Sequence, residues 1–446
     1  MNPHRVIITA LIILCILGGL AIPISFAADL GIPMAEYSTR RAALASSLDS
    51  NSVVVMRAGD YKMRSNDTEY RYRQESNFLY LTGLKSPNNY IILSPQPMNI
   101  DGKPARVAIF LHEPGDSSGI RLASDEIILS VKRFNEIFKS ILPSVKTLYL
   151  SAPDLSFIND WVNDKKIFLD KNIRKELEQQ YPDLRVKNAL PLFGKFREIK
   201  SGAELSLMRK AMELTGKGLE RAFTNCVPGK WEYELQADIE YEMFRGGAEY
   251  VGFPSIVGSG LNSLILHYDD NNRQMNAGDV VVMDVGAEYD GYSADITRTI
   301  PVSGKFTSAQ KDIYKTVLRA QKAIIGIIKS GVPMKDLDAK AKEVLTQAGY
   351  KKYIRHGVTH PVGLDVHDIW ASDTLKSGMV VTVEPGLYIP ADADSIAQEF
   401  RGFGIRIEDD VLVTDSGCEV LTKAVPKEIS DIEQLMRKKL NPFSPN

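Results

Sequence analysis

In the first part of the chain, short runs of apolar residues alternate with amphipathic or charged stretches. Four apolar runs predict β-strands, at residues 52–56, 90–93, 106–111 and 147–150. Amphipathic or charged stretches with helical spacing accompany them, at residues 37–48, 124–138 and 170–180. Strands that alternate with helices form parallel or mixed sheets, so we predict an α/β domain over residues 28–195.

The second part of the chain contains longer amphipathic helices. The spacing of apolar residues predicts them at 204–222, 307–329 and 334–348. The middle helix begins with a capping-box pair, Thr307 and Gln310, and the last one ends at Gly349. Such helices commonly cover a sheet, so residues 196–446 are predicted to form a second domain, and the fold class is α/β (α+β).

Residues 1–27 have the features of a secretory signal peptide. A basic start at Arg5 precedes an apolar run, Pro23 and a small-residue cleavage site at 25–27. We therefore expect an exported protein, periplasmic or secreted. The alternative is a membrane-anchored protein with an uncleaved signal, because the apolar run is nearly long enough to span a bilayer.

Composition narrows the classes of function. Of 446 residues, 44% are hydrophobic and 25% are charged, which is enough apolar content for a folded core. Lys and Arg number 54 against 56 for Asp and Glu, and this balance argues against a nucleic-acid partner. Three cysteines are too few for a disulfide framework. Beyond the signal segment only Cys226 and Cys418 remain, as two buried thiols or as one bridge.

A predicted hairpin at residues 280–299 carries two carboxylates on one face. Asp290-Gly291 is a favoured two-residue turn, and a turn there places Asp284 opposite Thr297. Asp295 lies two residues from Thr297 and therefore on the same face. Two like charges on an apolar hairpin are destabilising unless a partner neutralises them, and a divalent cation would do so.

Two further carboxylates and a group of histidines follow. The apolar run 381–383 leads into Glu384 and a Pro-Gly turn, and the run 404–413 carries Arg406 and Glu408 on one face. Four of the six histidines lie between residues 267 and 367. Buried strands rarely carry isolated carboxylates, so this combination indicates a shared metal site.

These motifs, together with residues 64–78 and 80–83, resemble the pita-bread metallopeptidases, and among them the aminopeptidase P (Xaa-Pro aminopeptidase) group, over roughly residues 38–438. The resemblance implies an N-terminal creatinase-like α/β domain and a C-terminal pita-bread metallopeptidase domain. It also implies two divalent metal ions, with Mn²⁺ expected and Zn²⁺ or Co²⁺ as alternatives. The residues that match the family's metal ligands are Asp284, Asp295, His360, Glu384 and Glu408.

The resemblance assigns a role to each of these residues. Asp295 and Glu408 would bridge the metals, Asp284 would bind one of them, and His360 with Glu384 would bind the other. A metal-bridging hydroxide would attack the scissile carbonyl, and Glu384 would carry the proton to the leaving nitrogen.

Other polar residues would act on the substrate side. The resemblance places His267 and His367 next to the substrate, with His356 nearby, although ordinary polar packing would also account for them. Arg406 and Tyr388 would orient the carboxylate of Glu408. Trp370 would either shape the pocket wall or simply pack.

The implied activity is release of the N-terminal residue from peptides with proline in the second position. Two rivals stay open: prolidase, an Xaa-Pro dipeptidase with the same five ligands, and a non-catalytic peptide-binding member, which would be expected to have lost ligands. A homo-oligomer, dimer or tetramer, is also implied, in which Arg64 and Asp67 reach the site of a neighbouring subunit.

Overall fold

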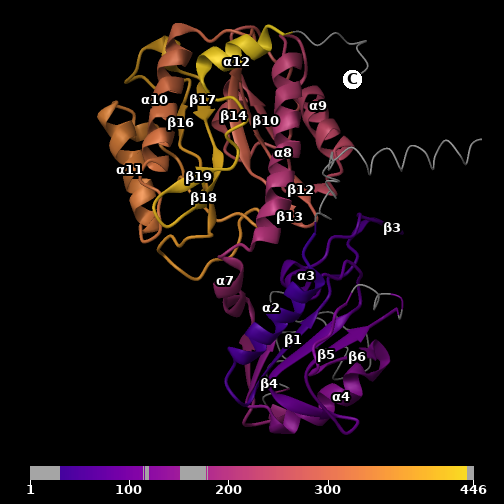
Figure 1. The fold of residues 1–446 in the computed structure, drawn as a ribbon. Helices are drawn as coiled ribbons and strands as arrows, with labels where there is room; N and C mark the ends of the chain where they lie inside the picture. The colour runs from indigo at the N-terminus through magenta and orange to yellow at the C-terminus, as the bar shows by residue number, and fades with distance from the viewer. Residues whose placement is uncertain (1–30, 114, 116–119, 151–176, 178, 439–446) are drawn as a thin grey trace, which may run out of the picture. The chain divides into compact units, whose positions relative to one another are not determined.

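The computed structural model describes residues 31–113, 115, 120–150, 177 and 179–438 (Figure 1). The predicted signal segment lies outside these residues, as does most of the predicted helix at 170–180. The described residues from 32 to 438 belong to one compact unit. No helix within the described ranges is long and apolar enough to cross a membrane.

The first part of the chain forms a mixed six-stranded sheet. Its strands, in spatial order, are β6 (Glu126–Ser130), β5 (Lys103–Leu111), β4 (Tyr90–Ile100), β1 (Ser52–Arg57), β7 (Thr147–Leu150) and β8 (Arg185–Asn188). The pairs β1–β4 and β4–β5 are antiparallel, whereas β5–β6, β1–β7 and β7–β8 are parallel. All four predicted strands are therefore present, in a sheet of mixed type.

Helices cover both faces of this sheet because its central strand is buried on both sides. Val54 and Met56 of β1 face the core that includes α2 (Met34–Ser46) and α3 (Ser76–Thr82). Val53 and Val55 face the other core, which is closed by α4 (Phe134–Ile141). Successive side chains of a strand point to opposite faces, so the unbroken apolar run of β1 supplies both cores.

The predicted helix at residues 124–138 is wrong in its first half and confirmed only from Phe134 onward. Residues 126–130 form β6, and the helix begins only at Phe134. The run Ile127-Ile128-Leu129 extends the sheet as a parallel partner of β5, from Val107 opposite Glu126 to Leu111 opposite Ser130. In the folded chain, residues 126–130 can pair with the free edge of β5, and this pairing outweighs the preference for a helix that their spacing suggests.

The predicted domain boundary at 195/196 stays a prediction. Helix α7 (Leu190–Arg197) runs across it, and α8 (Gly202–Asn225) follows after a short link. The small antiparallel pair β2 (Met63–Ser65) and β3 (Thr68–Glu69) lies apart from the main sheet and is exposed.

The second part of the chain contains several small sheets. Their strands are β9 (Tyr250–Val251), β10 (Ile256–Ser259), β11 (Val280–Val285), β12 (Ala287–Tyr289), β13 (Tyr292–Ser293), β14 (Ile296–Pro301), β15 (Val380–Val383), β16 (Gly386–Ile389), β17 (Phe403–Arg406), β18 (Asp409–Val413) and β19 (Cys418–Val420). They group as β10-β11-β14, β13-β12-β9, β15-β18-β19 and β16-β17. Short 3-10 helices interrupt the whole chain at η2 (Val131–Arg133), η3 (Leu142–Ser144), η4 (Gly260–Leu264), η5 (Lys351–Tyr353) and η6 (Gln398–Phe400).

Two helix pairs flank these strands (Figure 1). Helix α8 packs on α9 (Glu232–Arg245) and on β12 and β13, whereas α10 (Ser308–Ile325) packs on α11 (Met334–Gln347) and on β15, β16 and β17. Helix α12 (Ile429–Met436) packs against α8. The three predicted helices are confirmed, including the Thr307–Gln310 capping box, although α10 ends at Ile325 rather than near 329.

The predicted hairpin has the expected register. Asp284 lies opposite Thr297, and the turn residues Asp290 and Gly291 have φ of 51° and 83°. Such left-handed values are those of a two-residue hairpin turn. The predicted strand at 404–413 is, by contrast, broken: β17 ends at Arg406 and β18 begins at Asp409, in a different sheet.

The two cysteines of the described chain are free thiols rather than a bridge. Cys226 is buried in the core, and burial raises the pKa of its thiol to about 12. Cys418 is only half-buried. Neither thiol is near the cavity described next.

Candidate metal centre

Three of the four predicted carboxylate ligands lie where a strand ends and the chain passes to another sheet. Glu384 occupies the gap between β15 and β16, Glu408 the gap between β17 and β18, and Asp295 the gap between β13 and β14. Their backbone N–H groups are bound outside the strand ladders: Glu384 donates to Val358 and Glu408 to Thr297. Asp284 lies on β11 itself, between β10 and β14. Because of these gaps between strands, the side chains point into one space between the sheets.

That space is a cavity of about 550 Å³. All five predicted metal ligands line it, together with the predicted substrate-side residues His267, His356, His367 and Arg406. The metal ligands are Asp284, Asp295, His360, Glu384 and Glu408, and Tyr388 does not reach the cavity. An apolar wall of Phe253, Pro254 and Ile256 completes it. The structure therefore brings the predicted residues together, while the role of each stays a prediction.

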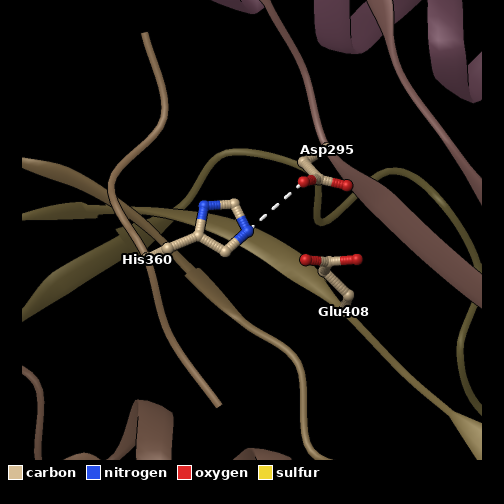
Figure 2. A group of neighbouring side chains, drawn as sticks. All are labelled: Asp295, His360 and Glu408. Atoms are coloured by element: carbon tan, nitrogen blue, oxygen red, sulfur yellow. Dashed lines mark ion pairs between the residues drawn. The ribbon is translucent and has the colours of Figure 1, made fainter. Parts of the chain in front are cut away.

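Three of the ligands form the tightest group (Figure 2). One donor atom from each of Asp295, His360 and Glu408 lies within 4.8 Å of the other two. The Nε2 atom of His360 is 3.5 Å from Asp295 Oδ2 and 3.6 Å from Glu384 Oε1. In Figure 2 the imidazole points toward the carboxylate of Asp295, with the carboxylate of Glu408 beside it. Donor atoms from separate elements thus converge on one point.

The electrostatics of this group favour a cation. Burial, followed by the charges of neighbouring carboxylates, raises the pKa of Asp295 and of Glu408 well above the ordinary range. Burial also raises the pKa of Glu384 to about 8; Asp284 adds to this shift and Arg406 opposes it. Such shifts mean that the charged forms lack a compensating partner, which a divalent ion would supply.

The donor atoms themselves fit a divalent metal. The Oδ1 atoms of Asp284 and Asp295 are buried and have no hydrogen-bond partner among the described residues. Burial lowers the pKa of His360 to about 4, so its imidazole is neutral and offers a lone pair at neutral pH. Four carboxylates and one imidazole form a mainly hard-oxygen donor set, suited to manganese and tolerated by zinc or cobalt.

A hydrogen-bonded chain extends from this group, and it corrects one detail of the sequence analysis. Arg406 donates to Asp284 Oδ2 at 2.6 Å, not to Glu408. The carboxylate of Glu408 is instead held by the Thr297 hydroxyl, at 2.6 Å. Arg406 also donates to the hydroxyl of Tyr388 at 2.7 Å, and that hydroxyl is 2.7 Å from Nε2 of His356. Tyr388 therefore links Arg406 to His356 rather than to a carboxylate.

Other predicted residues are placed as follows. The ring of His367 lies edge-on to that of His360, with 4.2 Å between centroids. Trp370 does not line the cavity and is 40% exposed, so the structure supports neither a place in the pocket wall nor burial in a core. Arg64 and Asp67 lie on and beside the exposed β2–β3 pair and do not line the cavity of their own chain.

The sequence analysis missed Thr297 and the apolar wall. Thr297 could have been identified, because it follows Asp295 by two residues on the same face of the hairpin. Phe253 and Pro254 precede β10, and no periodicity in their segment distinguishes them from ordinary loop residues. Only the folded chain places them opposite the carboxylates.

Comparison with known proteins identifies the class. The family model described as metallopeptidase family M24 matches residues 206–415, and the one described as aminopeptidase P, N-terminal domain, matches residues 37–118. A curated Xaa-Pro aminopeptidase of Haemophilus influenzae is 33% identical over 91% of this chain and 98% of the relative. The chain therefore belongs to metallopeptidase family M24.

Solved structures place the similarity within one group of that family. A structure of E. coli aminopeptidase P with the inhibitor Pro-Leu matches with a TM-score of 0.78 and 32% identity, over 92% of this chain and 99% of the other. A Zn-substituted E. coli aminopeptidase P in complex with product matches with a TM-score of 0.77 and 33% identity, over the same shares. The predicted fold class and the predicted metallo-aminopeptidase class are confirmed.

Proposed function

We propose that this protein releases the N-terminal residue from peptides that carry proline in the second position. The observation that carries the proposal is the cavity in which all five predicted metal ligands converge. Similarity to Xaa-Pro aminopeptidases over most of both chains supports the same assignment. A non-catalytic peptide-binding member would be expected to have lost ligands, and this chain retains all five.

The substrate class follows from the chemistry of proline. An X-Pro bond is a tertiary amide without an N–H group, and the ring fixes φ, so peptidases that bind an extended backbone accept it poorly. The apolar wall of Phe253, Pro254 and Ile256 offers a surface against which the pyrrolidine ring would pack. The opposite, polar side of the cavity would receive the scissile carbonyl.

Two divalent ions, with manganese as the native metal, complete the proposed site. Asp284, Asp295 and Glu408 would hold one ion, and His360 and Glu384 the other, with Asp295 and Glu408 shared. When bound, the ions supply Lewis-acid polarisation of the carbonyl and a water of lowered pKa. The unpartnered Oδ1 atoms of Asp284 and Asp295 support this assignment.

The residues of the chain would then bind substrate and move the proton. The leaving nitrogen of proline must gain a proton as the C–N bond breaks, so that it departs as a free secondary amine. Glu384 would carry that proton on its carboxylate, because it lines the cavity beside His360, where the metal and its water would lie. His267 and His367 would bind the substrate from the cavity wall. Arg406 would fix Asp284 through the hydrogen bond already described.

Product analysis by mass spectrometry tests the activity. Manganese-loaded protein is expected to release Ala from Ala-Pro-Ala and to leave the dipeptide Ala-Pro intact. Cleavage of Ala-Pro alone would instead indicate a prolidase, the nearest alternative. Failure to cut either peptide with metal bound would contradict the proposal.

Export through residues 1–27 is part of the proposal, since those residues have the order of a signal peptide. Intact-mass analysis of protein recovered from outside the cytoplasm is expected to show an N-terminus at residue 28 or 29. A retained segment would indicate a membrane anchor.

We also propose a homo-oligomer in which the β2–β3 pair contacts a neighbouring subunit. Met63 on β2 and Tyr70 directly after β3 are 53% and 57% exposed, so both large side chains are available to a neighbouring subunit. Light scattering is expected to give a dimeric or tetrameric mass, and a monomer would contradict the proposal.

A further inference from the structure

Residues 358–371 connect the ligand His360 with the substrate-side residue His367, and two separate sets of contacts hold them. The first set involves residues 358–362, which run beside β15. The N–H of Val362 donates to Val380, that of Thr382 to His360, and that of Glu384 to Val358. Backbone hydrogen bonds thus hold the metal-binding half of the segment alongside the strand that leads to Glu384.

The second set holds residues 363–371, which we name the His367 loop. Asp365 and Asp368 lie on either side of His367 in sequence, and both pair with Arg197 at the end of α7. Arg197 Nη2 is 2.8 Å from Asp365 Oδ2 and also bonds to Asp368 Oδ1. Lys200 adds a contact of 3.1 Å to Asp368 Oδ2. The side chains of Arg197, Lys200 and Asp368 are each only 1% exposed.

Residues before and within α3 reinforce this second set. Ser76 donates to Asp365 Oδ1 at 2.6 Å, and Arg73 donates to the backbone carbonyl of Leu364 at 2.6 Å. The Oδ1 atom of Asn77 accepts from Nη1 of Arg197 at 2.8 Å. Both terminal nitrogens of Arg197 are therefore bonded and orient its guanidinium, whereas its Nε has no hydrogen-bond partner among the described residues.

The packing at the start of the loop is too close for any side chain at residue 363. A Cβ atom added to Gly363 would lie 2.0 Å from Asp368 Oδ2 and 3.2 Å from the side chain of Lys200. Such a separation is far below van der Waals contact, so glycine is required for the carboxylate of Asp368 to reach its two cations. The loop is built around this ion cluster.

We propose that Arg197 is a positioning residue for the substrate: it fixes the His367 loop through Asp365 and Asp368, and thereby sets the place of His367 in the cavity. The effect that we expect on kcat/KM rests on the proposed function. Hydrogen bonds to β15 hold the backbone of His360. The loop reaches this ligand only through Val366, the His367 ring and the bond from Asp368 N–H to Pro361, so we expect loss of Arg197 to move the loop more than the metal ligand. The residues of α3 and α7 thus control substrate binding, while the small sheets control metal binding.

Two variants and a matched control test this division. Arg197→Lys keeps the charge but loses the planar fork that joins Asp365 to Asp368. Asp365→Ala removes one partner at a half-exposed position, with a side chain 41% exposed, and should fold normally. Arg41→Lys is the control, because Arg41 is an equally buried arginine that pairs with Glu126, outside the cavity and the loop.

Three quantities are measured on each full-length, manganese-loaded protein. Amide hydrogen exchange of peptides covering 363–371 is expected to speed up in Arg197→Lys and Asp365→Ala but not in Arg41→Lys. The kcat/KM for Ala-Pro-Ala is expected to fall roughly 10–100-fold in the same two variants, the range found when partners of site residues are removed. The Kd for Mn²⁺ is expected to stay at the wild-type value.

The inference is overturned if exchange in the loop and kcat/KM stay at wild-type values in both variants. It is also overturned if Arg41→Lys loses activity by the same factor, or if Mn²⁺ affinity falls in step with kcat/KM. A wild-type protein inactive on Ala-Pro-Ala would contradict the proposed function instead, while the exchange measurement would still decide whether Arg197 anchors the loop.

Discussion

Asp295→Asn is expected to lower kcat/KM for Ala-Pro-Ala by about 10³-fold or more. The substitution keeps the size of the side chain but removes the charge that lies closest to both His360 and Glu408. Loss of a metal ligand removes several kcal/mol of transition-state stabilisation, and about 4 kcal/mol corresponds to about 10³ in rate. Steady-state kinetics at saturating Mn²⁺ measure the effect.

Asp290→Asn is a matched control for this change. Asp290 lies in the same hairpin, at the turn, with a φ of 51° that asparagine also accepts. Its carboxylate pairs with Lys85 and does not line the cavity. We expect kcat/KM within about twofold of wild type, as for most surface substitutions. If Asp295→Asn were fully active, Asp295 could not be a metal ligand.

Chelation of the metal is expected to lower the melting temperature by about 10 °C. Ions bound at about 1,000 times their Kd stabilise the folded state by about 4 kcal/mol, and each kcal/mol shifts Tm by about 2–4 °C in a domain of this size. Burial and then the charges of neighbouring carboxylates raise the pKa of Asp295, Glu408 and Glu384, and both effects disfavour the charged site again when the ions leave. Differential scanning fluorimetry with and without EDTA measures the shift.

The same experiment on Asp295→Asn separates metal binding from general effects of the chelator. This variant is expected to show little response to EDTA, and its metal-free form should be at least as stable as the metal-free wild type, because one of the buried like charges is gone. A wild-type Tm that is indifferent to EDTA would contradict a metal site in this cavity.

The features that the sequence predicted well are those fixed by local chemistry. The turn at Asp290-Gly291 determined the register of the hairpin, and the register determined which face Asp284 occupies. The Thr307–Gln310 pair marked the first turn of α10, and Gly349 the end of α11. In each case a few residues that are adjacent in sequence determine the local structure.

The features that it did not predict depend on contacts across long sequence separations. Residues 126–130 form a strand because they pair with the edge of β5. Residues 404–413 form two strands instead of one because their two halves belong to different sheets. The partners of Arg406 were incomplete for the same reason: it contacts Asp284, which is 122 residues away, and it reaches Glu408 through the hydroxyl of Thr297. The resemblance named the five ligands, but only the fold shows how they are supported.

The strand interruptions at Glu384 and Glu408 have a consequence for the choice of metal. Both gaps join the same two sheets, β15-β18-β19 and β16-β17, so the backbone on either side of each carboxylate is anchored in a different layer. The spacing between these donor atoms is therefore set by how the layers pack, and not by side-chain torsions alone. Discrimination between ions of different radius becomes a property of the hydrophobic packing that holds each sheet in place, with Leu387 of β16 in one core and Val411 of β18 in another.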